Sequence, residues 1–445
     1  MKINEREIVL DMLLEIIEGG KFSHTVLNHT LSKYQDLKKQ ERSLIARLAT
    51  GTVERYITLD YRINQVASLP VNKMKPLIRN LLRLSVYQLL YMDNIPDSAV
   101  CNEAVKLAKK RKFVKLSGFV NAVLRGIIRT KDDFKLPNRD NNVVDYLSVV
   151  YSTPEWLVSN LLGQYDKDQV EKILSASLEV SKTSIRCNIT KVSPSQLKDE
   201  LIQEGVSVLD SQYLDYGFYI YDYDHLEGIE AFKKGHFVVQ DISSQLVSHV
   251  AGINSEDFVV DVCAAPGGKA LHASQSANKV LARDLTEYKI DLINDNIKRL
   301  DITNVETEVW DASVLDTSLI GKADVVIADL PCSGIGVMGK KVDIKYKMTH
   351  FQQIELVELQ RKILTTIQNY VKPGGTLIYS TCTINNDENI GNMNWFLQNF
   401  DFQAVSLASH LPEDLRNEDT NKGHLQLLQG VHGTDGFFIS KMKKN

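Results

Sequence analysis

The feature that most constrains the fold of this 445-residue chain is a regular alternation of strand-like and helix-like segments from Val238 onward. Short apolar runs are separated by helical stretches of about a dozen residues. This rhythm predicts a doubly wound, mostly parallel sheet with right-handed crossovers. The runs are FVVDVCA, VLARD, VETEVWDA, ADVVIADLP, GGTLIYSTC and GFFISKM. We therefore expect an α/β domain over residues 236–445.

The first part of the chain has a different periodicity. From Ile8 to about Leu124, apolar residues recur at helical spacing with almost no alternation of period two, which predicts an all-α domain over residues 1–138. The polar, proline-containing stretch 130–142 interrupts this pattern and predicts a linker. Residues 139–235 mix helical stretches with strand-like runs and predict a small α/β region. Its tyrosines between 216 and 223 could stack RNA bases, but strand packing is the favoured interpretation.

Charge is distributed unevenly between these regions. Residues 1–140 carry 25 Lys and Arg against 15 Asp and Glu, a net charge of +10, whereas the remainder carries 27 against 41, a net charge of −14. A basic domain joined to an acidic one indicates that the first meets a polyanion. Lys106, Lys109 and Lys110 flank an apolar helical stripe and are candidates for phosphate contact.

Several classes of protein are disfavoured by the same sequence. The N-terminus has charges where a signal peptide would be apolar, and no stretch approaches about 18 uninterrupted apolar residues, so we expect a cytoplasmic protein without a membrane segment. The five cysteines are scattered and never occur in CxxC spacing. This argues against both a disulfide framework and a zinc site, and we expect no metal.

Two of these cysteines end apolar β-type runs, Cys332 in ADLPCSG and Cys382 in IYSTCT. In a doubly wound sheet, ligands bind at the carboxyl ends of the strands, and a thiol placed there can act as a nucleophile once it is ionised. Both runs follow the turn DVCAAPGGK, residues 261–269, whose glycines permit close backbone approach to a nucleotide-like ligand. The turn matches neither a P-loop nor a GxGxxG fingerprint.

Aspartates end three further strand-like runs. Asp284 lies about 20 residues after the glycine turn, where a carboxylate can accept hydrogen bonds from ribose hydroxyls. Asp311 could accept a hydrogen bond from an adenine amino group, and Asp329 ends the fourth strand. A single aspartate of this kind is frequently a helix cap, but three in register favour a binding role.

The runs DVCAAPGGKA, VLARD, WDAS, ADLPCSG and IYSTCT resemble the successive motifs of S-adenosylmethionine-dependent RNA cytosine-5 methyltransferases. The segments IPDSAVCNEAVKLAKK and GFVNAVLRG resemble the NusB-like helical RNA-binding domain of one branch, and the combination is similar to the bacterial 16S ribosomal RNA cytosine-5 methyltransferases. The resemblance implies a Rossmann-like methyltransferase domain, S-adenosylmethionine as cofactor and 16S rRNA as partner. We expect a monomer. The alternatives are methylation of another RNA such as tRNA, methylation of DNA with Cys332 as nucleophile, and a non-catalytic RNA-binding assembly factor.

The resemblance also implies roles for individual residues. Cys382 would be the nucleophile, Cys332 would help product release, and Asp329 and Lys269 would border the target base. The implied cofactor site consists of Cys263, Ala264, Ala265, Pro266, Gly267, Gly268, Lys269, Asp284, Asp311 and Asp329. The aspartate-proline-cysteine motif has Leu330 where alanine is common.

The stretch GKKVDIKYKMTH, residues 339–350, follows Cys332 directly. It is interpreted as a lip that grips RNA through its lysines and Tyr346, and the alternative is a solvated loop. The lysines are Lys340, Lys341, Lys345 and Lys347.

Overall fold

Two chain segments that are far apart in sequence build the first unit of the structure. The computed structural model describes residues 4–180 and 182–445. Unit 1 extends to Glu179 and includes Met338–Lys347, and unit 2 comprises Val180–Val337 and Met348–Asn445. The helices of residues 143–176 thus belong to unit 1 and the strands of residues 183–239 to unit 2. The predicted boundaries near residues 138 and 235 do not coincide with this division, and a three-domain description stays a prediction.

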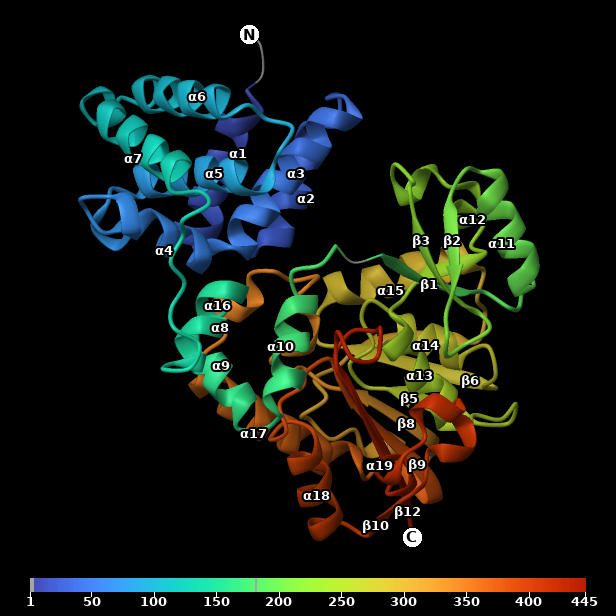
Figure 1. Ribbon diagram of the computed structural model, residues 1–445. Coiled ribbons are helices and arrows are strands. Elements are labelled where there is room, and N and C mark those ends of the chain that lie inside the picture. The colour runs from blue at the N-terminus through green and yellow to red at the C-terminus, as the bar shows by residue number, and fades with distance from the viewer. Residues whose placement is uncertain (1–3, 181) are drawn as a thin grey trace. The chain divides into compact units, whose positions relative to one another are not determined.

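Unit 1 is helical, as predicted for its N-terminal part. Helix α5 is the central helix: α1, α3, α4, α6 and α7 pack against it, and its residues Leu81 and Leu82 are completely buried (Figure 1). The helices are α1 (Glu5–Leu13), α2 (Ser23–Lys33), α3 (Lys39–Glu54), α4 (Tyr56–Val66), α5 (Pro76–Tyr91), α6 (Asp97–Lys110), α7 (Ser117–Arg129), α8 (Val143–Tyr151), α9 (Glu155–Leu162), α10 (Lys167–Ala176) and α16 (Ile344–Lys347).

The segment Met338–Lys347, here called the strap, folds into unit 1. Val342 is part of the same apolar core as the helices. The carboxylate of Asp343 accepts hydrogen bonds from the Ser23 backbone N–H at 2.8 Å and from its hydroxyl at 2.7 Å, which anchors the start of α2. The Tyr346 hydroxyl lies 2.6 Å from the carbonyl oxygen of Glu54 and 2.7 Å from that of Ser152. Apolar packing and hydrogen bonds therefore both hold the strap.

This placement contradicts part of the RNA-lip interpretation. Lys345 is completely buried, and the Lys347 ammonium donates to the backbone carbonyl of Gly20 at 3.1 Å. Only Lys340 and Lys341 among the four lysines are exposed in the structure described. The physical reason is that Val342 and Tyr346 pack on helices about 300 residues earlier in the chain, and a local charge pattern carries no information about such a partner.

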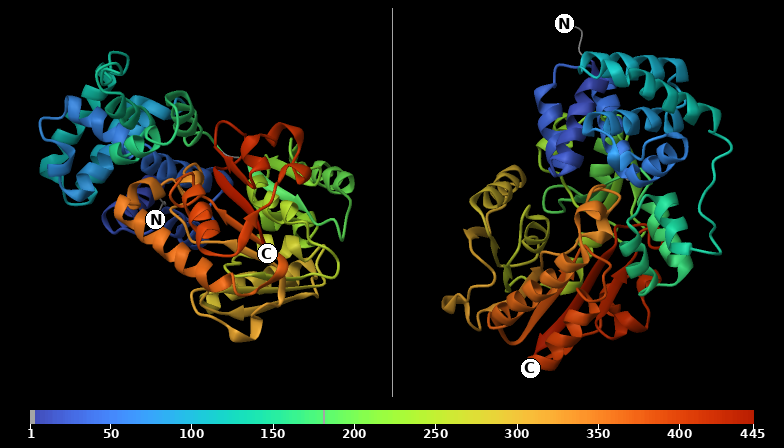
Figure 2. Two further views of the ribbon diagram at one scale, coloured as in Figure 1. Left: turned by 90° about the horizontal axis from the view of Figure 1, so that it is seen from below. Right: turned by 90° about the vertical axis from the view of Figure 1, so that its left-hand side faces the viewer.

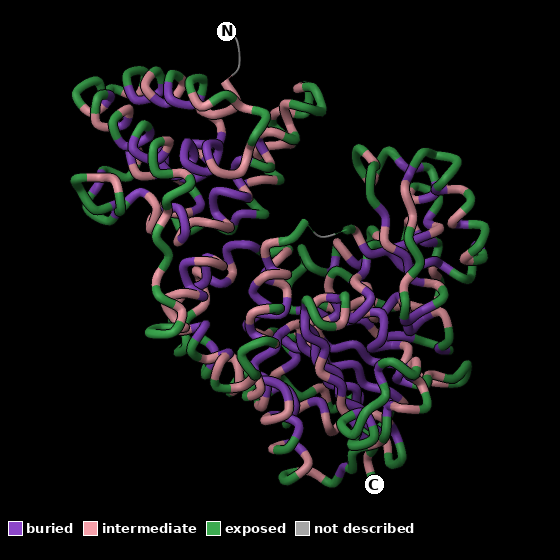
Figure 3. Tube along the Cα trace, in the orientation of Figure 1, coloured by how far each residue is buried: buried purple, intermediate pink, exposed green. Residues whose placement is uncertain are grey.

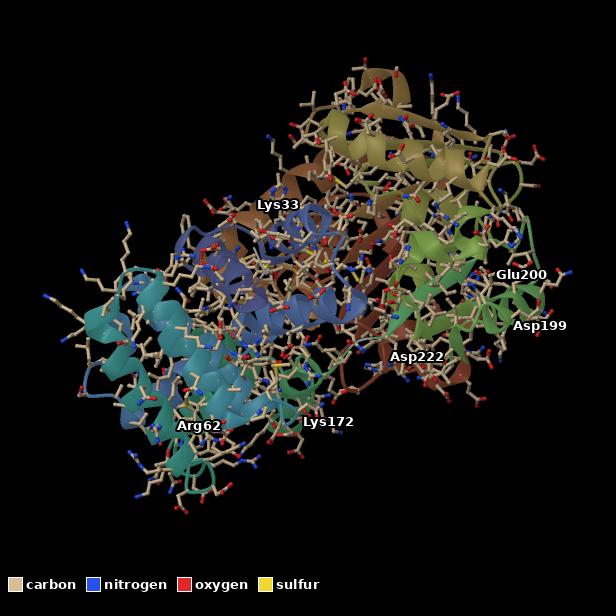
Figure 4. All side chains as sticks on the ribbon, turned by 90° about the horizontal axis from the view of Figure 1, so that it is seen from above. Lys33, Arg62, Lys172, Asp199, Glu200 and Asp222 are labelled. Carbon is tan, nitrogen blue, oxygen red and sulfur yellow. The ribbon has the colours of Figure 1, made fainter. Side chains whose placement is uncertain are left out.

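The smaller sheet of unit 2 is antiparallel, with strand order β2-β3-β1-β4. Its strands are β1 (Thr183–Cys187), β2 (Ser207–Asp210), β3 (Gly217–Tyr221) and β4 (Phe237–Val239), accompanied by α11 (Pro194–Gln203) and α12 (Glu230–Lys233). Glu200 of α11, labelled in Figure 4, hydrogen-bonds with the His236 ring nitrogen Nδ1 at 2.7 Å and fixes the helix beside β4. Tyr216, Tyr219 and Tyr223 pack against the apolar cores of unit 2, which supports the packing interpretation for them, whereas Tyr221 is exposed.

The larger sheet is mostly parallel, as predicted, with strand order β10-β12-β9-β8-β5-β6-β7 and β11 paired to β12. Its strands are β5 (Phe258–Asp261), β6 (Lys279–Asp284), β7 (Val305–Val309), β8 (Ala323–Asp329), β9 (Val371–Thr381), β10 (Phe402–Ala404), β11 (His424–Leu427) and β12 (Phe437–Lys444). Strands β5 to β9 pair in parallel, and β12 is antiparallel to β9. The helices are α13 (Ile242–Ala251), α14 (Gly268–Ala273), α15 (Glu287–Leu300), α17 (His350–Ile367), α18 (Ile390–Asn399) and α19 (Glu418–Asn421).

Both faces of this sheet are covered by helices (Figure 2). Val259 packs with α13, α14 and α15, whereas the next residue, Val260, packs with α17 and α18. This alternation explains why the central strands β5 and β8 read as nearly continuous apolar runs and are largely buried (Figure 3), whereas β7 at the edge is not. The chain leaves β5 for β6 and β7 on one side and returns to β8 and β9 on the other, so the switch point lies between β5 and β8. No helix within the described ranges is both long and apolar enough to span a membrane.

Candidate active site

The two predicted thiols meet at the carboxyl ends of neighbouring strands. Cys332 follows β8, Cys382 follows β9, and the two strands pair in parallel. The sulfur atoms lie 3.4 Å apart, which is within hydrogen-bond distance for sulfur. Both residues are partly exposed, whereas Cys101 and Cys187 are buried. The structure thus brings together the two cysteines that the strand-end pattern had singled out.

An ion pair stands beside the thiols. The Lys269 ammonium, on α14, lies 2.7 Å from Oδ2 of Asp329, and the Ser380 hydroxyl donates to the other oxygen of that carboxylate at 2.8 Å. Burial alone lowers the pKa of Lys269, but the Asp329 charge and hydrogen bond outweigh burial, and negative charge at Asp261 and Cys382 adds to this effect. The pKa of Lys269 is therefore raised, and the residue is a fixed cation. The same attraction favours a thiolate at Cys382.

Cys332 has the opposite electrostatic surroundings. Its hydrogen bond with Cys382 raises its pKa most, followed by burial and by the negative charges of Cys382, Glu388 and Asp329. The pKa of Cys332 therefore lies well above its ordinary value, and this residue is a thiol at neutral pH. The two sulfurs are close in space but differ in the charges around them.

The glycine turn that precedes α14 is held by Asp284 at the end of β6. Gly267 has φ of +105°, a backbone conformation that favours glycine. Asp284 accepts hydrogen bonds from the Ala265 N–H at 2.9 Å, and from the Leu285 N–H and the Lys289 ammonium, both at 2.7 Å. Asp284 therefore has a structural role in the turn, and its buried carboxylate keeps acceptor capacity for a further donor.

The N–H groups of this turn are largely used within the protein. Ala264 donates to the carbonyl of Arg283 at 2.8 Å, and Gly267 donates to the carbonyl of Ala264 at 2.7 Å. Together with the Ala265 bond to Asp284, these contacts leave the middle of the turn without a cradle of free N–H groups. The N–H groups of Ala264, Ala265 and Gly267 are therefore used to hold the turn itself.

Asp261, the last residue of β5, is the site residue that the sequence analysis missed. It is completely buried, and neither carboxylate oxygen has a hydrogen-bond partner among the described residues. Burial raises the pKa of Asp261 to about 7, while the Lys269 charge opposes this shift. An unpartnered buried carboxylate at the switch point suits a ligand with positive charge. The sequence contained a signal that could have identified Asp261, because this residue ends an apolar strand run as Asp284 does.

The remaining predicted residues differ in their placement. Asp311 lies after β7, is exposed, and accepts a hydrogen bond from the Ser313 N–H at 2.8 Å, which is a local turn contact. Cys263 lies in the turn, and burial followed by the Asp284 and Asp261 charges raises its pKa, so it is an unreactive thiol. The structure therefore joins the two thiols to each other and Lys269 to Asp329 by direct contact, and the charge of Cys382 acts on Lys269. Asp311 lies outside both pairs.

Comparison with known proteins places this geometry in a family. The family model described as 16S rRNA methyltransferase RsmB/F matches residues 250–443, the NusB family model matches residues 3–129, and the ferredoxin-like domain model of RsmF/B-like methyltransferases matches residues 153–223. The probable ribosomal RNA small subunit methyltransferase B of Bacillus subtilis is 35% identical over 100% of this chain and 99% of its own length. This chain belongs to the RsmB/F methyltransferase family.

Further RsmB/F-type similarity extends over the whole chain. The probable ribosomal RNA small subunit methyltransferase B of Synechocystis is 29% identical, over 99% of this chain and 100% of the relative. The crystal structure of PH0851 has the same fold, with a TM-score of 0.81, 24% identity and 100% coverage of both chains. The predicted NusB-like and Rossmann-like parts are therefore confirmed, and the predicted small α/β region corresponds to the ferredoxin-like domain.

Proposed function

We propose that this protein transfers a methyl group from S-adenosylmethionine to carbon 5 of a cytosine in 16S ribosomal RNA. The observation that carries the proposal is the pair of thiols, 3.4 Å apart, at the switch-point edge beside Lys269 and Asp329. Membership of the RsmB/F family supports ribosomal RNA as the substrate class. The NusB-like part of unit 1, which has an excess of basic residues, is the proposed RNA-binding region.

The chemistry explains why a thiolate is needed. Carbon 5 of cytosine is too weak a nucleophile to take a methyl group, but a thiolate that adds to carbon 6 makes carbon 5 enamine-like. S-adenosylmethionine supplies the electrophilic methyl group when it is bound. After transfer, carbon 5 loses its proton to a base, the double bond between carbons 5 and 6 forms again, and the sulfur leaves carbon 6 as a thiolate.

The charges around the two sulfurs support a division of roles. Cys382 is the proposed nucleophile because the Lys269 cation favours its ionised form. Cys332, which keeps its proton, is the proposed aid to product release. Asp329, fixed by Lys269 and Ser380, is proposed to hydrogen-bond N3 of the cytosine and stabilise the adduct.

Substitution of the two cysteines tests this division. Cys382→Ala is expected to abolish methylation and to form no covalent RNA adduct, because the bond to carbon 6 cannot form. Cys332→Ala is expected to accumulate a protein–RNA species that survives denaturing electrophoresis, because release is slowed. Cys101→Ala, at a buried position in unit 1, is the control and should behave as the unmodified protein. Adduct in Cys382→Ala but not in Cys332→Ala would reverse the two roles.

Three carboxylates are proposed to contact the cofactor. Buried Asp261 and Asp284 would hold its cationic and hydroxyl groups, and exposed Asp311 its adenine amino group.

Mapping of 5-methylcytosine in rRNA and tRNA, with and without the protein, identifies the substrate RNA. Methylation of tRNA alone would exclude the 16S rRNA assignment.

Asp284→Ala is expected to weaken S-adenosylmethionine binding. Charge-assisted hydrogen bonds contribute about 1.5–3 kcal/mol each, so a loss of roughly 10-fold to 150-fold in affinity is expected. Calorimetric titration measures it, with Asp284→Asn as the conservative variant and Asp295→Ala, on the exposed side of α15, as the control. Unchanged affinity in Asp284→Ala would remove this residue from the cofactor site.

We propose that residues 1–138 and 139–235 bind RNA and that residues 236–445 carry out catalysis. The cytoplasm is the proposed compartment, and a monomer is the proposed functional form.

A further inference from the structure

Glu388 is a buried carboxylate that the proposed reaction has not used. It lies six residues after Cys382, between β9 and α18, and is completely buried. Each of its oxygens accepts two hydrogen bonds. The donors to Oε1 are the Ser333 hydroxyl at 2.5 Å and the Asn385 amide at 3.1 Å, and the donors to Oε2 are the Ser333 N–H at 2.8 Å and the Gln360 amide at 3.0 Å. All four hydrogen-bonding positions of the carboxylate are thus filled.

These contacts tie the two cysteine loops together. Ser333 directly follows Cys332, so a residue of the Cys382 loop holds the backbone of the Cys332 loop. The Gln360 amide, on α17, also donates to the carbonyl of Pro331 at 2.8 Å, on the other side of Cys332. The backbone on both sides of Cys332 is therefore held by the hydrogen-bonded pair of Glu388 and Gln360.

Glu388 also brings negative charge to one of the two sulfurs. Burial raises its pKa, and the donors from Ser333, Asn385 and Gln360 oppose this shift. Three of the four donors are N–H groups, which fit an ionised carboxylate and cannot accept a hydrogen bond from the O–H of a protonated one. Its hydrogen-bond donors among the described residues are all neutral. Its negative charge raises the pKa of Cys332, as a smaller cause than the hydrogen bond with Cys382, burial and the Cys382 charge.

We propose that Glu388 is a positioning residue that fixes Cys332 at hydrogen-bond distance from Cys382 and, by its charge, keeps the single proton of the ionised pair on Cys332. The pair then has one form, in which the Cys332 S–H donates to the Cys382 thiolate. The positive charge of Lys269 favours the thiolate at Cys382, and the negative charge of Glu388 disfavours a thiolate at Cys332. Both charges therefore favour the form with the proton on Cys332. This inference rests on the proposed function for its purpose, but the proton distribution is a property of the free protein.

The test measures which sulfur reacts with iodoacetamide as a function of pH in the full-length protein, without RNA or cofactor. Mass spectrometry of the peptides separates Cys332 from Cys382. In the protein without substitutions, Cys382 should be alkylated at lower pH than Cys332. Prior alkylation of Cys332 would overturn the proposal without any variant, and it would leave open whether the protein methylates RNA.

Glu388→Gln removes the charge and keeps the size of the side chain. Loss of one charge next to a thiol changes its pKa by about one unit, so alkylation of Cys332 relative to Cys382 at neutral pH should rise about 10-fold. Asp387→Asn makes the same change of charge at the adjacent, exposed residue and should leave the ratio unchanged. An unchanged ratio in folded Glu388→Gln contradicts the proposal.

Glu388→Asp distinguishes the effect of the carboxylate charge from the effect of the side-chain length. It keeps the carboxylate but shortens the side chain by one methylene, so the order of alkylation should stay as in the unmodified protein while the rate of methylation falls. Should Glu388→Gln fail to fold, an order of alkylation reversed in Glu388→Asp would contradict the charge effect.

Discussion

Lys269 and Lys345 lie one in each unit, and both are largely removed from solvent: the Lys269 side chain is 12% exposed and Lys345 is completely buried. They differ in what surrounds the ammonium group. Lys269 lies 2.7 Å from a carboxylate oxygen of Asp329, and its pKa is raised. Lys345, in the strap, donates to the carbonyl of Tyr151 at 3.3 Å. In the described part of the chain, no carboxylate lies within salt-bridge distance of Lys345. Burial, with a smaller effect of Arg55, lowers its pKa to about 7 against the attraction of Glu54.

The comparison shows that burial alone does not determine the charge of a lysine. A partner at contact distance compensates the lost hydration of Lys269, so the active-site edge holds a permanent cation. Lys345 has no such partner in the described structure, so the protonated form of its side chain destabilises unit 1. The same residue type is thus part of the proposed chemistry in one unit and a pH-sensitive feature of the fold in the other.

The largest expected effect comes from Lys269→Met. Removal of a preorganised charge at the reacting atoms typically lowers the rate about 10²-fold to 10³-fold. Incorporation of labelled methyl groups into rRNA under single-turnover conditions measures this effect. Lys269→Arg, which keeps the charge, should retain more activity, and Lys345→Met should stay within a few-fold of the unmodified protein. Equal losses in Lys269→Met and Lys345→Met would remove the distinction between the two lysines.

A second prediction concerns the dependence of stability on pH. In the unfolded chain the pKa of Lys345 is about 10.4, and in the folded chain it is about 7. Between these values the unfolded chain binds a proton that the folded chain does not, so the free energy of unfolding rises with pH in this window, by at most about 1.4 kcal/mol per pH unit.

Lys345→Met should lack this rise. Urea unfolding at pH 7 and pH 9, followed by circular dichroism, compares the two proteins, and Lys341→Met, at an exposed position, is the control. The same increase in both Lys345→Met and the unmodified protein would show that another group titrates in this window.

The smallest expected effect concerns exposed lysines, which need no compensation by the protein. Lys106 and Lys109 are exposed on α6 and are candidates for phosphate contact. Each neutralised phosphate contributes about −0.7 to the slope of log affinity against log salt for single-stranded RNA. The double variant Lys106→Gln with Lys109→Gln should reduce the slope by about 1.4. The control replaces Lys279 and Lys298, exposed in unit 2, and an equal change there would indicate nonspecific attraction.

Local sequence patterns predicted the parts of the fold and site that depend on neighbouring residues. Cys332, Cys382 and Asp329 were found because each ends an apolar strand, and parallel strands bring such ends to one edge. The small sheet was predicted only as a mixture of helices and strands, because antiparallel pairing such as β1 with β4 joins segments about 50 residues apart.

Other features depend on contacts that no local pattern shows. Glu388 stands in a polar stretch without periodicity, and its role follows only from its bonds to Ser333 and Gln360. Lys345 and Lys347 follow a basic pattern that is typical of a solvated loop, yet Val342 and Tyr346 insert the stretch into a distant core. Asp261 was quoted within the glycine turn and its position at the strand end was not used.

The strap also determines the order in which the protein can be completed during synthesis. The hydrogen bond from Tyr346 to Glu54 joins residues 292 positions apart, and that from Ser23 to Asp343 joins residues 320 positions apart. At typical translation rates the strap emerges roughly 10–30 s after α10. Unit 1 therefore begins to fold first, but it acquires its last core residue, Val342, only after strands β1 to β8 have been made.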